Sequence, residues 1–487
     1  MAIDSTTDTD AILERARAGT RLMTIRGVSM RTISVGANLL LLVLVSPSEL
    51  GLLAVARGTF SLMQYVAELG IGRALLRRSV PPSQVEYAAL AGLQLLVGVA
   101  IIVIGAFWAA PILGFGAIDR AWHYPMLATV ATMLSLAWGT GARVRLERAL
   151  AYERLAVVDV LNVLTLNVGL LLFAVAHEFT IGVFVLLGVS TVVANWLLHH
   201  WAPGPRPSLN LRPLLGIARQ SSGFLVASTC AVLREQGTPV LIGGLFGLQV
   251  AGLYSFAERV AHVLNVTFDG FRNACIPAAV RLNGDVRSLR ALASRTLVGS
   301  ATLTAPLAVG AICAIPLLAA AVPRWAGAVT LMQWYVAAYA TYGVLAAAME
   351  PVAVATRGAS AAISEQASAL VVGWLMFAIV HALLGPSYLA VAAVAMYLAP
   401  VIALGIVIDH EVRPEITREV LRIGIAVVVS LLTYGGLRLF GAPSVVCAIV
   451  PSVMVVLAIP RFRAIPGVVA TRCAAIFSSR DPRARQP

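Results

Sequence analysis

Long apolar segments alternate with short polar connections along almost the whole chain. A helix needs about 20 apolar residues to cross the hydrocarbon core of a bilayer, and the sequence holds about fourteen segments of that length. The connections carry turn-forming residues and most of the charges. The predicted spans are 25–46, 50–72, 87–109, 121–141, 155–176, 180–198, 222–246, 251–277, 297–321, 326–349, 367–384, 388–408, 420–440 and 442–459.

The order of these spans divides the chain into two halves. Six precede a polar, proline-rich linker, Trp201–Pro213, and six follow it before a final pair. The sequence therefore predicts an all-α integral membrane protein with two pseudo-symmetric six-helix lobes and a C-terminal helix pair. The expected parts are a cytoplasmic N-terminal segment (1–24), the first lobe (25–201), the linker (202–213), the second lobe (214–408), the helix pair (409–463) and a basic tail (464–487).

Composition and charge agree with this interpretation. The chain is 59% hydrophobic and 12% charged, with a mean hydropathy of +0.87, whereas about 25% of residues are charged in soluble domains. With the N-terminus in the cytoplasm, 28 of the 36 basic residues fall in cytoplasmic connections and tails, and six fall within spans. Only Arg120 and Arg324 fall in outside loops, as the positive-inside rule requires. We therefore expect a multi-pass membrane protein with both ends cytoplasmic, and no nucleic-acid partner.

The eighth predicted span carries a regular series of polar residues. Successive members are 4, 3, 4 and 3 positions apart, so on one continuous helix they share a face. Charges inside a bilayer are costly, and such a face is expected to line a bundle interior or a wet cavity. The series is Glu258, His262, Asn265, Asp269 and Arg272.

The second span repeats this pattern. A shift of 201 positions aligns the series with Arg57, Ser61, Gln64 and Glu68, and aligns Gly252 with Gly51. We interpret this as an internal repeat, a feature of transporters, in which each copy gives one polar face to a shared cavity. The alternative is two helices that bury a few polar groups against their neighbours.

Four arginines within spans are the strongest candidates for substrate binding: Arg31, Arg57, Arg234 and Arg259. A guanidinium binds two phosphate oxygens at once, which suits an anionic headgroup such as a lipid-linked pyrophosphate. Alternatively, each arginine pairs with a local carboxylate. Arg234 and its neighbour Glu235 point in different directions on a regular helix, so local pairing does not easily account for all four. Gln64 and Asn265 complete the predicted substrate-binding set.

Carboxylates and a histidine within spans are candidates for binding a coupling proton or sodium ion. A lone buried histidine is more often simply hydrogen-bonded. Five scattered cysteines show no metal or redox spacing, so no cofactor and no metal are expected. The ion-coupling candidates are Glu235, Asp269, Glu68, Glu258 and His262.

Two stretches resemble the starts of the two halves of polysaccharide flippases: PSELGLLAVARGTFSLMQYVAELGIGRALLRR (47–78) and QGTPVLIGGLFGLQVAGLYSFA (236–257). The family is the Wzx-like branch of the multidrug/oligosaccharidyl-lipid/polysaccharide exporter superfamily. The resemblance implies a protein of the bacterial inner membrane that exports an undecaprenyl- or decaprenyl-pyrophosphate oligosaccharide from the inner to the outer leaflet. We expect it to work by alternating access. Arg31, Arg57 and Arg259 look like the arginines that line the central cavity of relatives. Many relatives have an aspartate where Thr238 stands here, and the nearest carboxylate is Glu235, about one turn earlier.

The expected function is therefore a flippase for polysaccharide or cell-envelope biosynthesis. Its expected partners are the lipid-linked oligosaccharide, membrane lipids and a polysaccharide polymerase or glycosyltransferases. One alternative is a multidrug/cation antiporter of the same superfamily, although four arginines suit cationic drugs poorly. Another is a membrane-embedded polysaccharide polymerase or ligase, but the short outside loops offer no catalytic constellation, so we expect no enzyme.

Overall fold

The computed structural model describes residues 26–27, 29–30, 32–34, 36–68, 71–77, 81–114, 123–220, 222–408, 412–414 and 418–458. Within these residues the regular structure is helical, without strands. The chain forms two compact units: unit 1 contains Met1–Phe256 with Trp374–Tyr388, and unit 2 contains Ala257–Gly373 with Leu389–Pro487. Arg31 and the whole of both predicted terminal segments (1–24 and 464–487) lie outside the described residues. The predicted domain boundaries stay a prediction.

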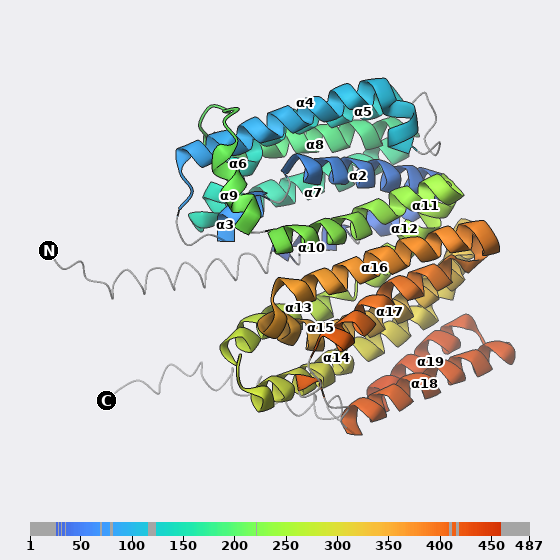
Figure 1. Ribbon diagram of the computed structural model, residues 1–487. Helices are drawn as coiled ribbons and strands as arrows, with labels where there is room; N and C mark the ends of the chain where they lie inside the picture. The colour runs from blue at the N-terminus through green and yellow to red at the C-terminus, as the bar shows by residue number, and fades with distance from the viewer. Residues whose placement is uncertain are drawn as a thin grey trace, which may run out of the picture. The chain divides into compact units, whose positions relative to one another are not determined.

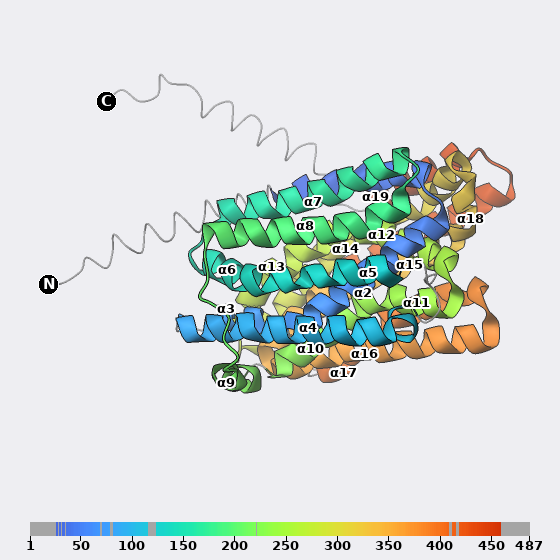
Figure 2. The ribbon, with the colours of Figure 1, turned by 90° about the horizontal axis from the view of Figure 1, so that it is seen from above.

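Unit 1 is a bundle of antiparallel helices (Figure 1). Helix α7 packs along α8, and α6 packs against both α4 and α8 (Figure 2). The short helix α9 lies across the ends of α3 and α4. Its helices are α2 (Pro47–Glu68), α3 (Ile71–Arg77), α4 (Gln84–Gly114), α5 (His123–Ala131), α6 (Leu136–Arg148), α7 (Tyr152–Val175), α8 (Phe179–Trp201), α9 (Arg212–Gln220), α10 (Ser222–Val232) and α11 (Thr238–Phe246).

Unit 2 is built around α15, which packs against α13, α14 and α17. The final helix pair packs on α14 through an apolar cluster that includes Val309, Ile423 and Val455. Two further helices, α12 (Leu248–His262) and α16 (Ala359–Ile379), contribute residues to both units. The helices of unit 2 are α13 (Asn265–Arg281), α14 (Val286–Ala321), α15 (Val329–Arg357), α17 (Leu389–Val407), α18 (Arg418–Leu439) and α19 (Ser444–Ala458).

Nine helices in the described part of the chain are long and apolar enough to cross a membrane. They coincide with nine of the predicted spans, and the all-α membrane fold is confirmed, while the count of fourteen stays a prediction. The other predicted spans are short, broken or only partly described. These are 25–46, where an apolar helix covers Thr32–Leu44; 121–141, broken by a 3₁₀ turn at Thr132–Ser135; 222–246, broken by a π turn at Leu233–Gly237; 251–277, broken at 263–264; and 442–459, where α19 has 15 residues.

The π turn between α10 and α11 has a local cause. Pro239 stands in the first turn of α11 and has no N–H, so it cannot donate to the carbonyl four residues earlier. The hydroxyl of Thr238 donates to the carbonyl of Arg234 at 2.5 Å, so a second carbonyl of this turn is occupied by a side chain. Wider i→i+5 turns of this kind often mark functional sites.

The internal repeat appears in the structure as a reciprocal contact. A Cβ atom on Gly51 of α2 would lie 1.8 Å from the carbonyl oxygen of Leu248, and one on Gly252 of α12 would lie 1.7 Å from that of Pro47. Gly51 and Gly252 correspond under the 201-residue shift, and so do Pro47 and Leu248. Within unit 1, therefore, the first turns of α2 and α12 pack against each other through equivalent residues. A two-fold symmetric contact has this property.

We predict that Gly51→Ala and Gly252→Ala each destabilise the protein. The new methyl group would displace backbone rather than a flexible side chain, at a cost of about 1–3 kcal/mol. Thermal unfolding in detergent measures the effect. The matched control is Gly424→Ala in α18, where a Cβ meets nothing within 4 Å, and it should leave stability unchanged or slightly raised. Equal melting temperatures for all three variants would contradict the prediction.

Candidate functional site

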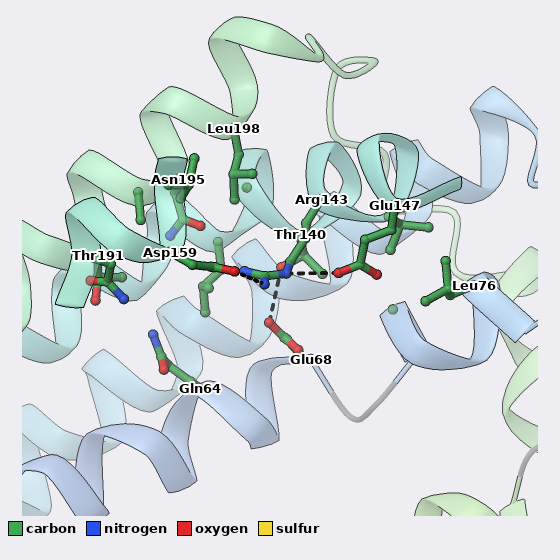
Figure 3. A pocket seen from close by; sticks show the side chains of 17 residues that line it. Gln64, Glu68, Leu76, Thr140, Arg143, Glu147, Asp159, Thr191, Asn195 and Leu198 are labelled. Atoms are coloured by element: carbon green, nitrogen blue, oxygen red, sulfur yellow. Dashed lines mark hydrogen bonds and ion pairs between the residues drawn. The ribbon is translucent and has the colours of Figure 1, made fainter. Parts of the chain in front are cut away.

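A cavity of about 600 Å³ lies inside unit 1, enclosed mainly by α2, α6, α7 and α8 (Figure 3). Each of these helices contributes polar side chains three or four positions apart, a spacing that places them on one face. Two predicted site residues, Gln64 and Glu68, line this cavity. The polar lining residues are Gln64, Glu68, Thr140, Arg143, Glu147, Asp159, Asn162, Thr191 and Asn195.

Arg143 of α6 organises one wall of the cavity. Its Nε donates to Glu147 Oε1 and its Nη2 donates to Asp159 Oδ2, both at 3.1 Å. Asp159 of α7 also forms an ion pair with Arg26 Nη1 at 2.9 Å. This carboxylate therefore lies between two guanidinium groups, and the ion pairs hold α6 and α7 in a fixed register.

Glu68 is oriented by a short hydrogen-bond chain. The amide of Gln94, almost fully buried in α4, donates to Thr140 Oγ1 at 2.8 Å. The Thr140 hydroxyl in turn donates to Glu68 Oε1 at 3.3 Å (Figure 3). This chain of hydrogen bonds links α4, α6 and α2 at one wall of the cavity.

The charge and hydrogen-bonding capacity of this cavity differ from those of a phosphate site. Its described lining holds three carboxylates and one guanidinium, that of Arg143. In the described part of the chain, the amides of Gln64 and Asn162 make no hydrogen bond to another residue. The cavity therefore offers carboxylate and amide groups to hydroxyls or cations, and it disfavours a multiply charged anion.

Two predicted residues of unit 2 lie against an aromatic cluster. The ring of His262 packs on Tyr339 with centroids 4.9 Å apart, and the Tyr339 hydroxyl donates to Asn265 Oδ1. The neighbouring hydroxyls of Tyr335 and Tyr397 are hydrogen-bonded at 2.6 Å. The half-buried ring of His262 thus lies against this tyrosine cluster.

Arg272 of α13 forms the second charged network. Its Nε pairs with Glu350 of α15, and its Nη2 lies 3.7 Å from Glu365 Oε1 of α16. The Tyr342 hydroxyl donates to the same Glu365 oxygen at 2.7 Å. Glu365 is 1% exposed, so this network joins three helices of unit 2. The sequence analysis missed Glu365 because the predicted span began at residue 367, whereas α16 begins at Ala359.

We expected the side chains of Arg234 and Glu235 to point apart, and this expectation was wrong. Arg234 is 8% exposed, and its Nη2 donates to Glu235 Oε1 at 3.1 Å. The two side chains meet because they lie in the π turn, where residues do not follow the directions of a regular helix. Trp374 Nε1 donates to Thr238 Oγ1 at 3.1 Å and holds the segment after the turn.

The predicted stripe from Glu258 to Arg272 is not one continuous helix. Helix α12 ends at His262 and α13 begins at Asn265, with i→i+3 bonds from Val263 N and Leu264 N between them. The Thr267 hydroxyl donates to the carbonyl of Leu264 and competes for the regular helical acceptor. The residues of the predicted stripe therefore share a face within α12 and within α13, but not across the turn between these helices.

The remaining predicted residues lie in separate parts of the structure. Arg57 is exposed on α2, in unit 1, whereas Glu258, Arg259 and Asp269 are half-buried in unit 2. The shared guanidinium pocket stays a prediction.

Sequence comparison places the chain in a family. Residues 40–323, more than half of the chain, match the model of the family described as polysaccharide biosynthesis protein. No curated protein sequence matches the chain.

Solved structures share the fold. The chain is similar to the lipid II flippase MurJ in an inward closed conformation, with a TM-score of 0.69 and 12% identity over 91% of this chain and 98% of that one. It is also similar to an inward-facing multidrug resistance MATE family transporter of the MOP superfamily, with a TM-score of 0.51 and 12% identity over 77% and 93% of the two chains. These findings confirm the resemblance expected from the two sequence stretches. The protein therefore belongs to the polysaccharide biosynthesis protein family and has the fold of the multidrug/oligosaccharidyl-lipid/polysaccharide exporter superfamily.

Proposed function

We propose that the protein translocates an anionic lipid-linked oligosaccharide, a polyprenyl-pyrophosphate sugar, across the bacterial inner membrane by alternating access. The observation that carries the proposal is the family match to polysaccharide biosynthesis proteins over residues 40–323. The fold shared with a lipid II flippase over 91% of the chain supports a flipping mechanism. In this proposal the protein moves its substrate and catalyses no bond formation.

The pyrophosphate is assigned to the arginines of the second and eighth spans, Arg57 and Arg259. Each guanidinium presents a planar fork that matches two phosphate oxygens, and the interaction strengthens where water is excluded. Arg31 and Arg234 are proposed as further members of this set. The carboxylate beside Arg234 reduces the positive charge that this arginine offers to a substrate, so we give it a supporting role.

The unit 1 cavity is assigned to a different task from phosphate binding. Its carboxylates would repel a pyrophosphate, while its amides and carboxylates suit sugar hydroxyls or a coupling cation. Among the ion-coupling candidates we favour Glu68, because it lines the cavity and accepts the Thr140 hydroxyl. Asp269, Glu258, Glu235 and His262 are retained as weaker candidates for binding a proton or a sodium ion.

A multidrug/cation antiporter is the second candidate function. The carboxylates of the unit 1 cavity and the fold shared with a MATE family transporter favour it. The two functions differ in their substrates, so expression in a drug-sensitive bacterial host separates them. Under the flippase proposal, resistance to cationic dyes stays at the level of the empty vector, and a reproducible gain in resistance would favour the antiporter.

Orientation and partners complete the proposal. We propose that both termini are cytoplasmic, following the distribution of arginines, so that the substrate enters from the side on which it is assembled. Glycosyltransferases on that side and a polymerase on the other would be the functional neighbours.

We predict that Arg57→Ala and Arg259→Ala each lower the translocation rate about 10- to 100-fold, the loss expected when a charge-assisted bond to substrate is removed. The measurement is flipping of a fluorescent polyprenyl-pyrophosphate oligosaccharide in proteoliposomes. Arg206→Ala is the matched control, because this arginine is exposed in the linker, and it should retain the wild-type rate. Full activity of both test variants would remove the proposal for these arginines.

We also predict that Glu68→Gln removes the response of transport to an imposed proton or sodium gradient. The amide keeps the size and an acceptor for Thr140 but cannot bind a proton or balance a cation. Rates are compared with and without each gradient in the same proteoliposomes. Glu147→Gln, on the same cavity wall but already paired with Arg143, should keep the response. An unchanged gradient response in Glu68→Gln would exclude this residue as the coupling site.

A further inference from the structure

The linker between α8 and α10 carries only positive charges. From Ala202 to Arg234 the sequence contains no aspartate or glutamate. Three arginines in this stretch, Arg206, Arg212 and Arg219, have exposed side chains. A positive segment placed between two membrane helices has to lie at the membrane surface, beside lipid headgroups.

The linker is held firmly against the bundle of unit 1. Arg145 donates through Nη1 to the carbonyl of Pro203 at 2.5 Å and through Nη2 to that of Ala202 at 2.6 Å. Further along, Ser208 N donates to the carbonyl of Ala88 at 2.8 Å. The linker lies so close to α4 that a Cβ on Gly92 would stand 1.9 Å from the Ser208 carbonyl oxygen. Its outer face is therefore presented in a fixed orientation.

Helix α9, within this linker, has one buried apolar face and one exposed face that carries both arginines and a leucine. Leu214 and Ile217 are buried in an apolar cluster with α3 and α4, which explains why the helix lies where it does. The opposite face carries Arg212, Leu215 and Arg219, three and four positions apart and hence adjacent. Leu215 is 68% exposed, and Leu209 just before the helix is 75% exposed.

We infer that this linker surface, formed by Arg206, Leu209, Arg212, Leu215 and Arg219, binds anionic phospholipid headgroups. The arginines match the lipid phosphates, and the two leucines reach the boundary between headgroups and acyl chains, which is how interfacial amphipathic helices bind. Charge complementarity and the exposed leucines together fit a lipid surface better than a soluble acidic partner, which would leave the leucines in water.

The ligand of this surface is bulk phospholipid rather than the transported substrate. The cavity of unit 1 is lined mainly by α2, α6, α7 and α8, with Gly72 and Leu76 of α3, and by no residue of α9. A headgroup that arrives laterally from the bilayer meets the linker surface directly, whereas a substrate enclosed by the protein does not. The inference is independent of the proposed function, and its test needs no transport measurement.

The test is native mass spectrometry of the full-length protein in detergent, titrated with phosphatidylglycerol or phosphatidylcholine. Wild type should retain phosphatidylglycerol preferentially, and Arg212→Gln/Arg219→Gln should lower that retention several-fold while phosphatidylcholine retention stays the same. The matched control is Arg281→Gln/Arg287→Gln, which removes the same charge from two exposed arginines of another connection. The control should keep most of the preference. Equal losses in both pairs, or no preference in wild type, would overturn the inference.

Two further measurements keep the test decisive. Leu215→Gln should weaken retention of both lipids, because it removes the apolar contact and leaves the charge intact. Inorganic pyrophosphate added as a competitor should not displace phosphatidylglycerol from wild type, and displacement would assign the site to substrate headgroups instead. The buried Leu214 and Ile217 are unchanged in every variant, and matching circular dichroism melts verify folding.

Discussion

The bilayer supplies no hydrogen-bond partners and little screening, so every charge within a span has to be compensated by the protein itself. This constraint accounts for the best-defined polar features of both units. Asp159 lies between two guanidiniums in unit 1, and Arg272 lies between two carboxylates in unit 2. Removing one partner of a fully buried pair costs about 3–5 kcal/mol. In these pairs the arginines are 21–40% exposed, so solvent screening makes the cost smaller. The networks therefore fix which helices lie together and in which register.

The two networks join helices that hold the same place in their halves, the fourth and the fifth. In unit 1, Arg143 of α6 pairs with Asp159 of α7. In unit 2, Glu350 of α15 and Glu365 of α16 both lie beside Arg272 of α13. The signs differ, because α6 supplies a guanidinium whereas α15 supplies a carboxylate. The third member also differs: it is Arg26 of the first predicted span in unit 1 and Arg272 of the eighth in unit 2. The two halves therefore share the helices that charge joins and differ in the charges that join them.

Hydropathy and periodicity predicted nine of the spans and the spacing on α2 that brings Gln64 and Glu68 into one cavity, since these depend on residues a few positions apart. They did not predict side-chain partners that lie on different helices. Glu365 was missed because hydropathy places the start of a span where apolar residues begin, although α16 extends two turns earlier. The pairing of Arg234 with Glu235 was misjudged because their directions were taken from a regular helix, whereas they lie in the π turn just before Pro239. Such local departures depend on the balance of a few hydrogen bonds, which a regular periodicity does not represent.

The contact at Gly51 and Gly252 limits which residues the two copies of the repeat can carry there. Each backbone carbonyl fills the volume in which the other helix lacks a side chain, so an alanine at either position forces the two helix starts apart. Elsewhere the aligned positions differ in chemistry, and Arg57 in one copy corresponds to Glu258 in the other. Side-chain size at this contact is therefore a shared property of both copies, whereas side-chain chemistry along the rest of the two helices is not.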